Sequence, residues 1–192
     1  MGGAVDGASI QLYSNRMRVV VADASSLILL AKCSMLLEYS RGVDLQVPRE
    51  AFEEVASASL VRRYDDAALV AKLARDGSIR VAAVTTYRDL PRALGRGEAA
   101  AIRLWFEADA DLVLSDDGRA IRTCRILGIP FTNSPRVVVD LYRTGAVPLA
   151  KARKALEALA VTGRYGRDMI AAALVVLQEV RQDDQTNDDP SA

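Results

Sequence analysis

Short apolar runs alternate with helix-length amphipathic segments along most of the chain, and this pattern is typical of a parallel α/β fold. The first run, RVVVA at 18–22, is rich in β-branched residues and continuous, as expected for a strand buried on both faces. Strands separated by helices favour a parallel sheet with right-handed crossovers. The pattern predicts strands at 18–22, 45–47, 79–84, 111–115 and 129–132.

The remaining segments carry helical patterns, and several begin with residues that cap helices. Ser25 or Ser26 is the predicted cap of the first helix, and Ser134 that of a later helix with Pro135 at its first position. The last two helices are predicted to form an appendage to the same core, and their apolar faces are either core or subunit contact. Helices are expected near 26–33, 35–39, 48–55, 64–75, 97–107, 117–127, 134–142, 149–160 and 168–180.

Length and composition indicate one globular domain between two polar ends. The chain has 192 residues, of which 51% are hydrophobic and 26% charged. Residues 1–17 are polar and glycine-rich, and a flexible lead is expected there. The domain is predicted to span 18–181, followed by a disordered acidic tail at 182–192.

Apolar content and charge narrow the possible surroundings of the protein. No apolar run reaches the roughly 18 residues that a membrane span needs, and the first residues lack the apolar centre of a secretory signal. We therefore expect a cytoplasmic protein with no membrane association. The formal net charge is zero, so binding to nucleic acid would require a local basic patch.

The absence of histidine excludes several chemistries. Without histidine, and with only two cysteines, Cys33 and Cys124, a zinc site is not expected, and both thiols are predicted to be small buried hydrophobes. Serine-hydrolase chemistry lacks its base, and no GxxxxGK[ST] phosphate loop occurs. A phosphoacceptor receiver domain would need a lysine late in the sheet, but no lysine lies between Lys72 and Lys151.

Acidic residues occur where two strands end and where two helices could reach the same rim. Asp23 follows the first strand, and Asp116 and Asp117 follow the fourth; ligands bind beyond the carboxyl ends of such strands. Glu53 or Glu54 lies on one helix and Glu98 in the first turn of another. Each acid alone could be a turn, cap or surface residue. Together they would repel one another, which favours a bound divalent cation such as Mg²⁺.

Four segments, in order, resemble the motifs of the PIN domain, the nuclease fold of VapBC-type toxin ribonucleases. They read VVADASSLILLAK at 20–32, VPREAFEEV at 47–55, LGRGEAAAI at 94–102 and LVLSDDGRAIR at 112–122. The segment LGIPFTNSPRVVVDLYRTG at 127–145 also follows the order of the family. The resemblance implies a three-layer α/β/α fold with a short central parallel sheet and a C-terminal helical appendage.

The resemblance also implies a metal-dependent endoribonuclease. Asp23, Glu54, Glu98 and Asp117 match the family's catalytic acids, with Glu53 as the alternate to Glu54 and Asp116 as a further metal ligand. Ser25 and Ser115 match its small hydroxyl residues. Mg²⁺ or Mn²⁺ held by Asp23, Glu98 and Asp117 would activate a water that cleaves RNA to a 5′-phosphate and a 3′-hydroxyl, with Glu54 orienting a water or the ligand shell.

Partners follow from the same resemblance. Arg96, Arg119 and Arg122 flank the acids and are candidates for RNA phosphate contacts, unless they lie on a solvated helix face or form salt bridges with nearby acids. Toxins of this type usually form homodimers and are bound by a small antitoxin protein. The alternative is a catalytically silent module of the same fold that binds nucleic acid or regulates.

Overall fold

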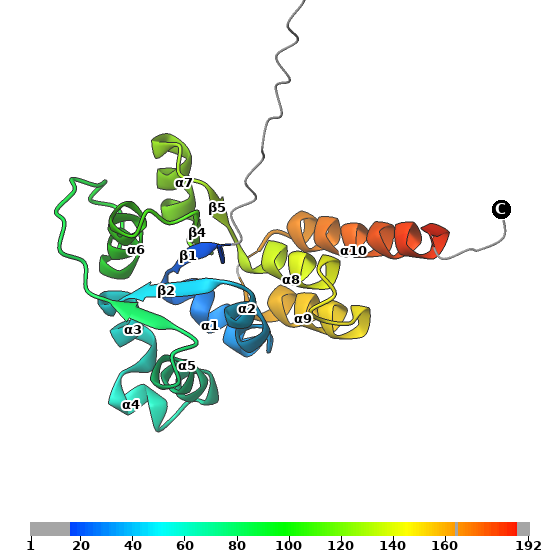
Figure 1. Cartoon of the computed structure of the whole chain (residues 1–192), viewed down its shortest axis with the longest axis horizontal. Helices are drawn as coiled ribbons and strands as arrows, with labels where there is room; N and C mark the ends of the chain where they lie inside the picture. Colours follow the sequence, from blue (N-terminus) through cyan, green and yellow to red (C-terminus); the bar gives the residue numbers. More distant parts are fainter. Residues whose placement is uncertain (1–15, 164, 188–192) are drawn as a thin grey trace, which may run out of the picture.

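The computed structural model describes residues 16–163 and 165–187 and has a five-stranded parallel sheet at its centre (Figure 1). The strand order is β3-β2-β1-β4-β5, so the first strand of the chain lies in the middle. All four pairings are parallel, as predicted. The strands are β1 (Val19–Ala22), β2 (Asp44–Pro48), β3 (Arg80–Ala82), β4 (Leu112–Leu114) and β5 (Phe131–Thr132).

Helices cover both faces of this sheet, so the predicted three-layer α/β/α class is confirmed. In Figure 1, α6 and α7 lie on one side of the sheet, and α1, α8 and α9 lie on the other. The helices are α1 (Ala24–Lys32), α2 (Leu36–Gly42), α3 (Arg49–Ala56), α4 (Ala58–Val61), α5 (Asp65–Arg75), α6 (Arg96–Glu107), α7 (Gly118–Leu127), α8 (Ser134–Arg143), α9 (Leu149–Thr162) and α10 (Arg167–Asn187).

The central strand β1 feeds two separate cores because successive side chains point to opposite faces. Val19 and Val21 pack with Ala101 and Leu104 of α6. Val20 and Ala22 belong to the larger core on the other face, together with helices α1, α8 and α9. All four β1 residues are buried, which explains the uninterrupted apolar run and places the end of β1 deep in the molecule.

Helix α9 packs in the core, whereas among the described side chains of α10 only Ile170 and Leu177 are buried there. Ala152, Ala155, Leu156 and Leu159 of α9 are all buried in the main hydrophobic cluster, so the apolar face of α9 is core. Helix α10 extends to Asn187, past the predicted domain end at residue 181. Residues 182–187 continue this helix, with no glycine or proline to stop it. Residues 1–15 of the predicted lead, and 188–192, lie outside the described residues.

Smaller differences from the predicted elements have local causes. Strand β3 stops at Ala82 because it pairs with β2 only as far as Pro48, where β2 ends. The cap of α1 is Asp23 instead of Ser25 or Ser26, and the cap of α8 is Asn133 instead of Ser134. Both cysteines are free and buried, as predicted. Among the helices described, none is long and apolar enough to span a membrane.

Candidate active site

Asp23 lies at the carboxyl end of β1 and is almost completely buried, with 1% of its surface exposed. Its Oδ1 accepts hydrogen bonds from Ser25 Oγ at 2.8 Å, Ser26 Oγ at 2.9 Å and Ser26 N at 3.0 Å, which caps α1. Burial raises the pKa of Asp23 from 3.8 to about 6, although hydrogen bonds from Ser115, Ser26 and Ser25 act to lower it. The carboxylate is thus costly to ionise where it lies.

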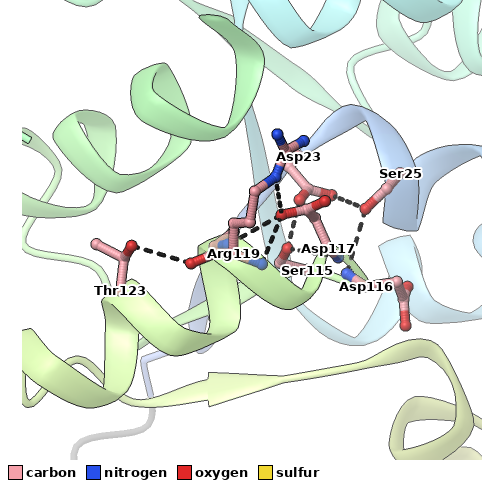
Figure 2. A network of polar contacts seen from close by, with 8 residues as sticks. Asp23, Ser25, Ser115, Asp116, Asp117, Arg119 and Thr123 are labelled. Atoms are coloured by element: carbon pink, nitrogen blue, oxygen red, sulfur yellow. Dashed lines mark hydrogen bonds and ion pairs between the residues drawn. The ribbon is translucent and has the colours of Figure 1, made fainter. Parts of the chain in front are cut away.

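Ser115 joins Asp23 to Asp117. Its hydroxyl donates to Asp23 Oδ2 and accepts from the backbone N of Asp117 at 3.2 Å. Asp117 caps α7, because its Oδ1 accepts from Arg119 N at 2.8 Å and from Ala120 N at 3.0 Å. Burial acts to raise the pKa of Asp117, but these hydrogen bonds and Arg119 outweigh it and lower the pKa. Asp117 therefore carries a charge beside a buried acid (Figure 2).

Asp116 faces away from this pair. Its carboxylate accepts from Ser134 N at 2.9 Å and from Tyr165 Oη at 2.6 Å. Figure 2 shows Asp116 directed away from Asp23 while Asp117 lies beside it. The structure thus brings Asp23, Ser25, Ser115 and Asp117 together but does not bring the Asp116 carboxylate with them. Sequence analysis missed the partners of Asp116, because nothing in the spacing joins residue 116 to residue 165.

A second acidic pair lies at the start of α6. The Glu54 carboxylate lies against Gly97, where an added Cβ would be 2.9 Å from both carboxylate oxygens. The Glu98 side chain folds back over Gly95, where a Cβ would be only 2.1 Å from Glu98 Oε2. Partial burial, followed by the charge of Glu98, raises the pKa of Glu54. The two glycines of LGRGEAAAI thus leave room for two carboxylates. Glu53 and Glu54 are both exposed on α3, and it is the Glu54 carboxylate that lies against Gly97.

Carboxylate oxygens are suitable ligands for a hard cation, but the acids of this site lie in two separate pairs. In the described part of the chain, no three acids or cysteines lie close enough to hold one ion as their side chains stand. Asp23 Oδ2 accepts one hydrogen bond, from Ser115, and a carboxylate oxygen has two lone pairs. Asp23 therefore keeps one acceptor position for a further ligand, and oxygen ligands are those that Mg²⁺ and Mn²⁺ prefer.

Basic and aromatic side chains lie on the helices and the loop next to these acids. Arg119 Nε is 3.5 Å from Asp117 Oδ1, so this arginine forms the salt bridge that the sequence left open. Arg122 is exposed on α7, and Arg96 is exposed at the start of α6. Arg96 shares a hollow of about 280 Å³ with Tyr87 and Arg103. Sequence analysis missed this loop. Its sequence, TTYRDLPR, combines basic and aromatic residues and was the available signal for nucleic-acid binding.

Comparison with known proteins places the chain in a family. No curated protein matches the chain. One similar solved structure is a PilT N-terminus domain protein from the archaeon Sulfolobus solfataricus P2, with 16% sequence identity, a TM-score of 0.43, and coverage of 78% of this chain and 97% of that one. A family model described as PIN domain (DUF3368) matches residues 19–180, which include β1, both acidic pairs and the C-terminal helices. The chain belongs to the PIN-domain family.

Proposed function

We propose that this protein is a divalent-metal-dependent endoribonuclease. The observation that carries the proposal is the buried Asp23 carboxylate at the end of the central strand, joined through Ser115 to the charged Asp117. Acids whose pKa is raised by burial gather at functional sites, and Asp23 also lies at the ligand-binding end of a parallel sheet. PIN domains have a nuclease-type fold, which agrees with this proposal.

In this proposal Asp23, Glu98 and Asp117 hold Mg²⁺ or Mn²⁺. When bound, such an ion lowers the pKa of water and neutralises charge on a phosphodiester. Ser115 and Ser25 fix the Asp23 carboxylate by donating to Oδ2 and Oδ1, so its orientation does not depend on the substrate. Glu54 lies against the first turn of α6 with a raised pKa, which suits an acceptor for a proton from water.

Comparing RNA cleavage with and without a divalent metal tests the proposal directly. Incubation of a structured RNA with the protein should give cleavage that chelation removes and that added Mn²⁺ restores. Products should carry 5′-phosphates, detectable by their susceptibility to a 5′-phosphate-dependent exonuclease. Cleavage that continues unchanged in chelator would show that the acids do not act through a metal. A protein that binds Mn²⁺ or RNA without cleaving would instead be the silent module.

RNA contacts are proposed for the loop before α6 and for α7. Glu107 Oε1 accepts from Thr85 N at 2.9 Å and from Thr85 Oγ1 at 3.0 Å, which ties this loop to α6. The loop therefore presents Tyr87, 81% exposed, at a fixed place. Arg96, Arg119 and Arg122 provide positive charge for phosphates around the acids.

Tyr87→Ala should cost more free energy of RNA binding than free energy of unfolding. Stacking of a base on an exposed aromatic ring contributes about 1–3 kcal/mol, so we expect about a fivefold or greater rise in Kd for a short single-stranded RNA. Fluorescence anisotropy in chelator measures this without cleavage. Tyr64→Ala is the matched control, because Tyr64 is also exposed and also has an arginine 5.6 Å from its ring centroid, against 5.5 Å for Tyr87. Equal losses in both variants would remove Tyr87 from the RNA surface.

The biological role is proposed from the resemblance to toxin ribonucleases. We infer that the protein is the toxin of a cytoplasmic toxin–antitoxin pair and works as a homodimer. Met169 and Val175 of α10 are exposed, and Met169 borders a groove of about 210 Å³ between α8 and α10, which offers an apolar contact to an antitoxin or a second copy. Arrested growth on expression, relieved by the product of a neighbouring small reading frame, would support the toxin role.

A further inference from the structure

Three donors converge on the Asp116 carboxylate from parts of the chain far away in sequence. Ser134 N, at the start of α8, donates to Oδ1 at 2.9 Å, and the Ser134 hydroxyl donates to Oδ2 at 2.5 Å. The Tyr165 hydroxyl, between α9 and α10, donates to Oδ1 at 2.6 Å. Ser134 is fully buried, and Tyr165 packs against the main core. This carboxylate is therefore held firmly on the side of the C-terminal helices.

The backbone of Asp116 is linked to the acidic pair on the opposite side. Its N–H donates to Ser25 Oγ at 3.2 Å, and Ser25 Oγ donates to Asp23 Oδ1 at 2.8 Å. Asp116 and Asp117 follow β4, and Asp117 has an extended backbone with φ −81° and ψ 125°. Successive side chains of extended backbone point to opposite sides. Fixing Asp116 towards the C-terminal helices thus directs Asp117 towards Ser115 and Asp23.

The segment after α9 is shaped to receive the Tyr165 ring. Gly163 ends α9, and a Cβ at this position would be 2.1 Å from Tyr165 Cε2 and 2.8 Å from the Leu159 carbonyl oxygen. A carbonyl oxygen and an aromatic ring cannot move away as the tip of a flexible side chain can. Only glycine fits here without displacing the ring. Gly163 at the end of α9 thus leaves room for the Tyr165 ring in the position from which its hydroxyl donates to Asp116.

We infer that Tyr165 is a positioning residue for the acidic site, and that Asp116 is its anchor and not a metal ligand. The expected effect on catalysis rests on the proposed nuclease function. The anchoring of Asp116 by Tyr165 does not depend on that function. Tyr165 and Ser134 hold the Asp116 carboxylate, and Asp116 in turn fixes the loop that carries Ser115 and Asp117. The C-terminal helices thereby form part of the site, since they supply the hydroxyl that orients it.

Tyr165→Phe tests the anchor, because it removes one oxygen and keeps the ring. Amide hydrogen exchange of the peptide covering residues 114–118 should become faster, by about tenfold, when one hydrogen bond to a charged group is lost. In the same variant we expect a severalfold rise in the Mn²⁺ dissociation constant, measured by calorimetry. Where the wild type cleaves RNA, kcat should fall by about tenfold with KM within about twofold.

Two substitutions of Asp116 separate an anchor from a metal ligand. Asp116→Asn keeps an oxygen that accepts from Tyr165 and offers an amide to Ser134 Oγ. Its Mn²⁺ affinity should therefore stay within about twofold of wild type, and amide exchange at 114–118 should stay as slow as in wild type. Asp116→Ala keeps none of these bonds, so it should change exchange and Mn²⁺ affinity in the same direction as Tyr165→Phe and at least as much. Asp117→Asn marks the loss expected on removing a ligand carboxylate. An Asp116→Asn variant with Mn²⁺ affinity as low as that of Asp117→Asn would overturn the inference.

The exchange measurement keeps this inference separate from the nuclease proposal. Tyr142→Phe, which removes the hydroxyl of a partly buried tyrosine on α8, is the control and should leave exchange at 114–118 unchanged. Unchanged exchange in Tyr165→Phe would overturn the anchoring whatever the protein cleaves. Faster exchange in a protein that neither binds Mn²⁺ nor cleaves RNA would support the anchoring and refute the nuclease. Faster exchange with unchanged Mn²⁺ affinity and kcat in an active enzyme would refute the positioning role.

Discussion

Asp23→Asn is expected to stabilise the metal-free protein at pH 7 and to lower its cleavage of RNA by about a hundredfold or more. The pKa of Asp23 is raised from 3.8 to about 6 by burial, so the folded state favours the protonated acid. The stability that this proton provides is present below the unfolded pKa and is lost as the pH rises through about 6. Ionisation at pH 7 thus costs about 3 kcal/mol, at 1.36 kcal/mol for each pKa unit.

Asparagine avoids this cost but loses part of the hydrogen bonding. Its Oδ1 keeps the bonds from Ser25 and Ser26, whereas its amide forces Ser115 to act as acceptor, at a cost of about 1 kcal/mol. We therefore expect a net gain of about 2 kcal/mol at pH 7, shrinking towards zero or a small loss near pH 4. Cleavage should fall by about a hundredfold or more, since a bound metal contributes several kcal/mol to lowering such a barrier.

Urea unfolding in chelator between pH 4 and 8 measures the gain. Asp65→Asn, an exposed acid in the first turn of α5, is the control for loss of charge alone. A gain that is the same at pH 4 and pH 7 would show that burial of the ionised carboxylate is not its cause. A variant with full cleavage would remove Asp23 from the site.

The position of Asp23 was predictable because its causes are local and repetitive. Four consecutive buried residues in β1 required a strand with helices on both faces, and in a parallel sheet the next residue meets the ligand-binding rim. The caps were less predictable. In DASS at 23–26 and TNS at 132–134 several neighbours cap helices about equally well, so tertiary bonds such as that from Ser26 Oγ to the Leu114 carbonyl decide between them.

The direction of Asp116 could not be read from the sequence, because it depends on contacts across the chain. Asp116 and Asp117 have the same chemistry and adjacent positions, and both would suit a metal. What separates them is that Ser134 and Tyr165 meet Asp116 and that Arg119 and Ala120 meet Asp117. Only the packing of α8, α9 and α10 against the core brings the first two donors to residue 116. The spacing of the motifs therefore located the acidic loop, but it did not show which of the two carboxylates faces Asp23 and which faces the C-terminal helices.

Gly97→Ala is expected to separate stability from activity at the second acidic pair. Gly97 is the second residue of α6, and alanine is the better helix former by up to about 1 kcal/mol. Its Cβ would, however, stand 2.9 Å from both Glu54 carboxylate oxygens. The Glu54 carboxylate is the free end of a flexible side chain, so it would move aside at little cost in stability. The thermal midpoint should stay equal or rise.

Cleavage by Gly97→Ala should nevertheless fall by about a hundredfold, because displacement of a reacting group by about 1 Å has effects of this size. Gly118→Ala is the matched control: it also adds a methyl group in the first turn of a helix beside a site acid, but no atom lies within 4 Å of its Cβ. A double-mutant cycle with Glu54→Gln gives the reason for the loss. If Gly97 serves to place Glu54, the double variant should be no less active than Glu54→Gln alone. Additive losses would mean that the methyl group acts on something other than Glu54.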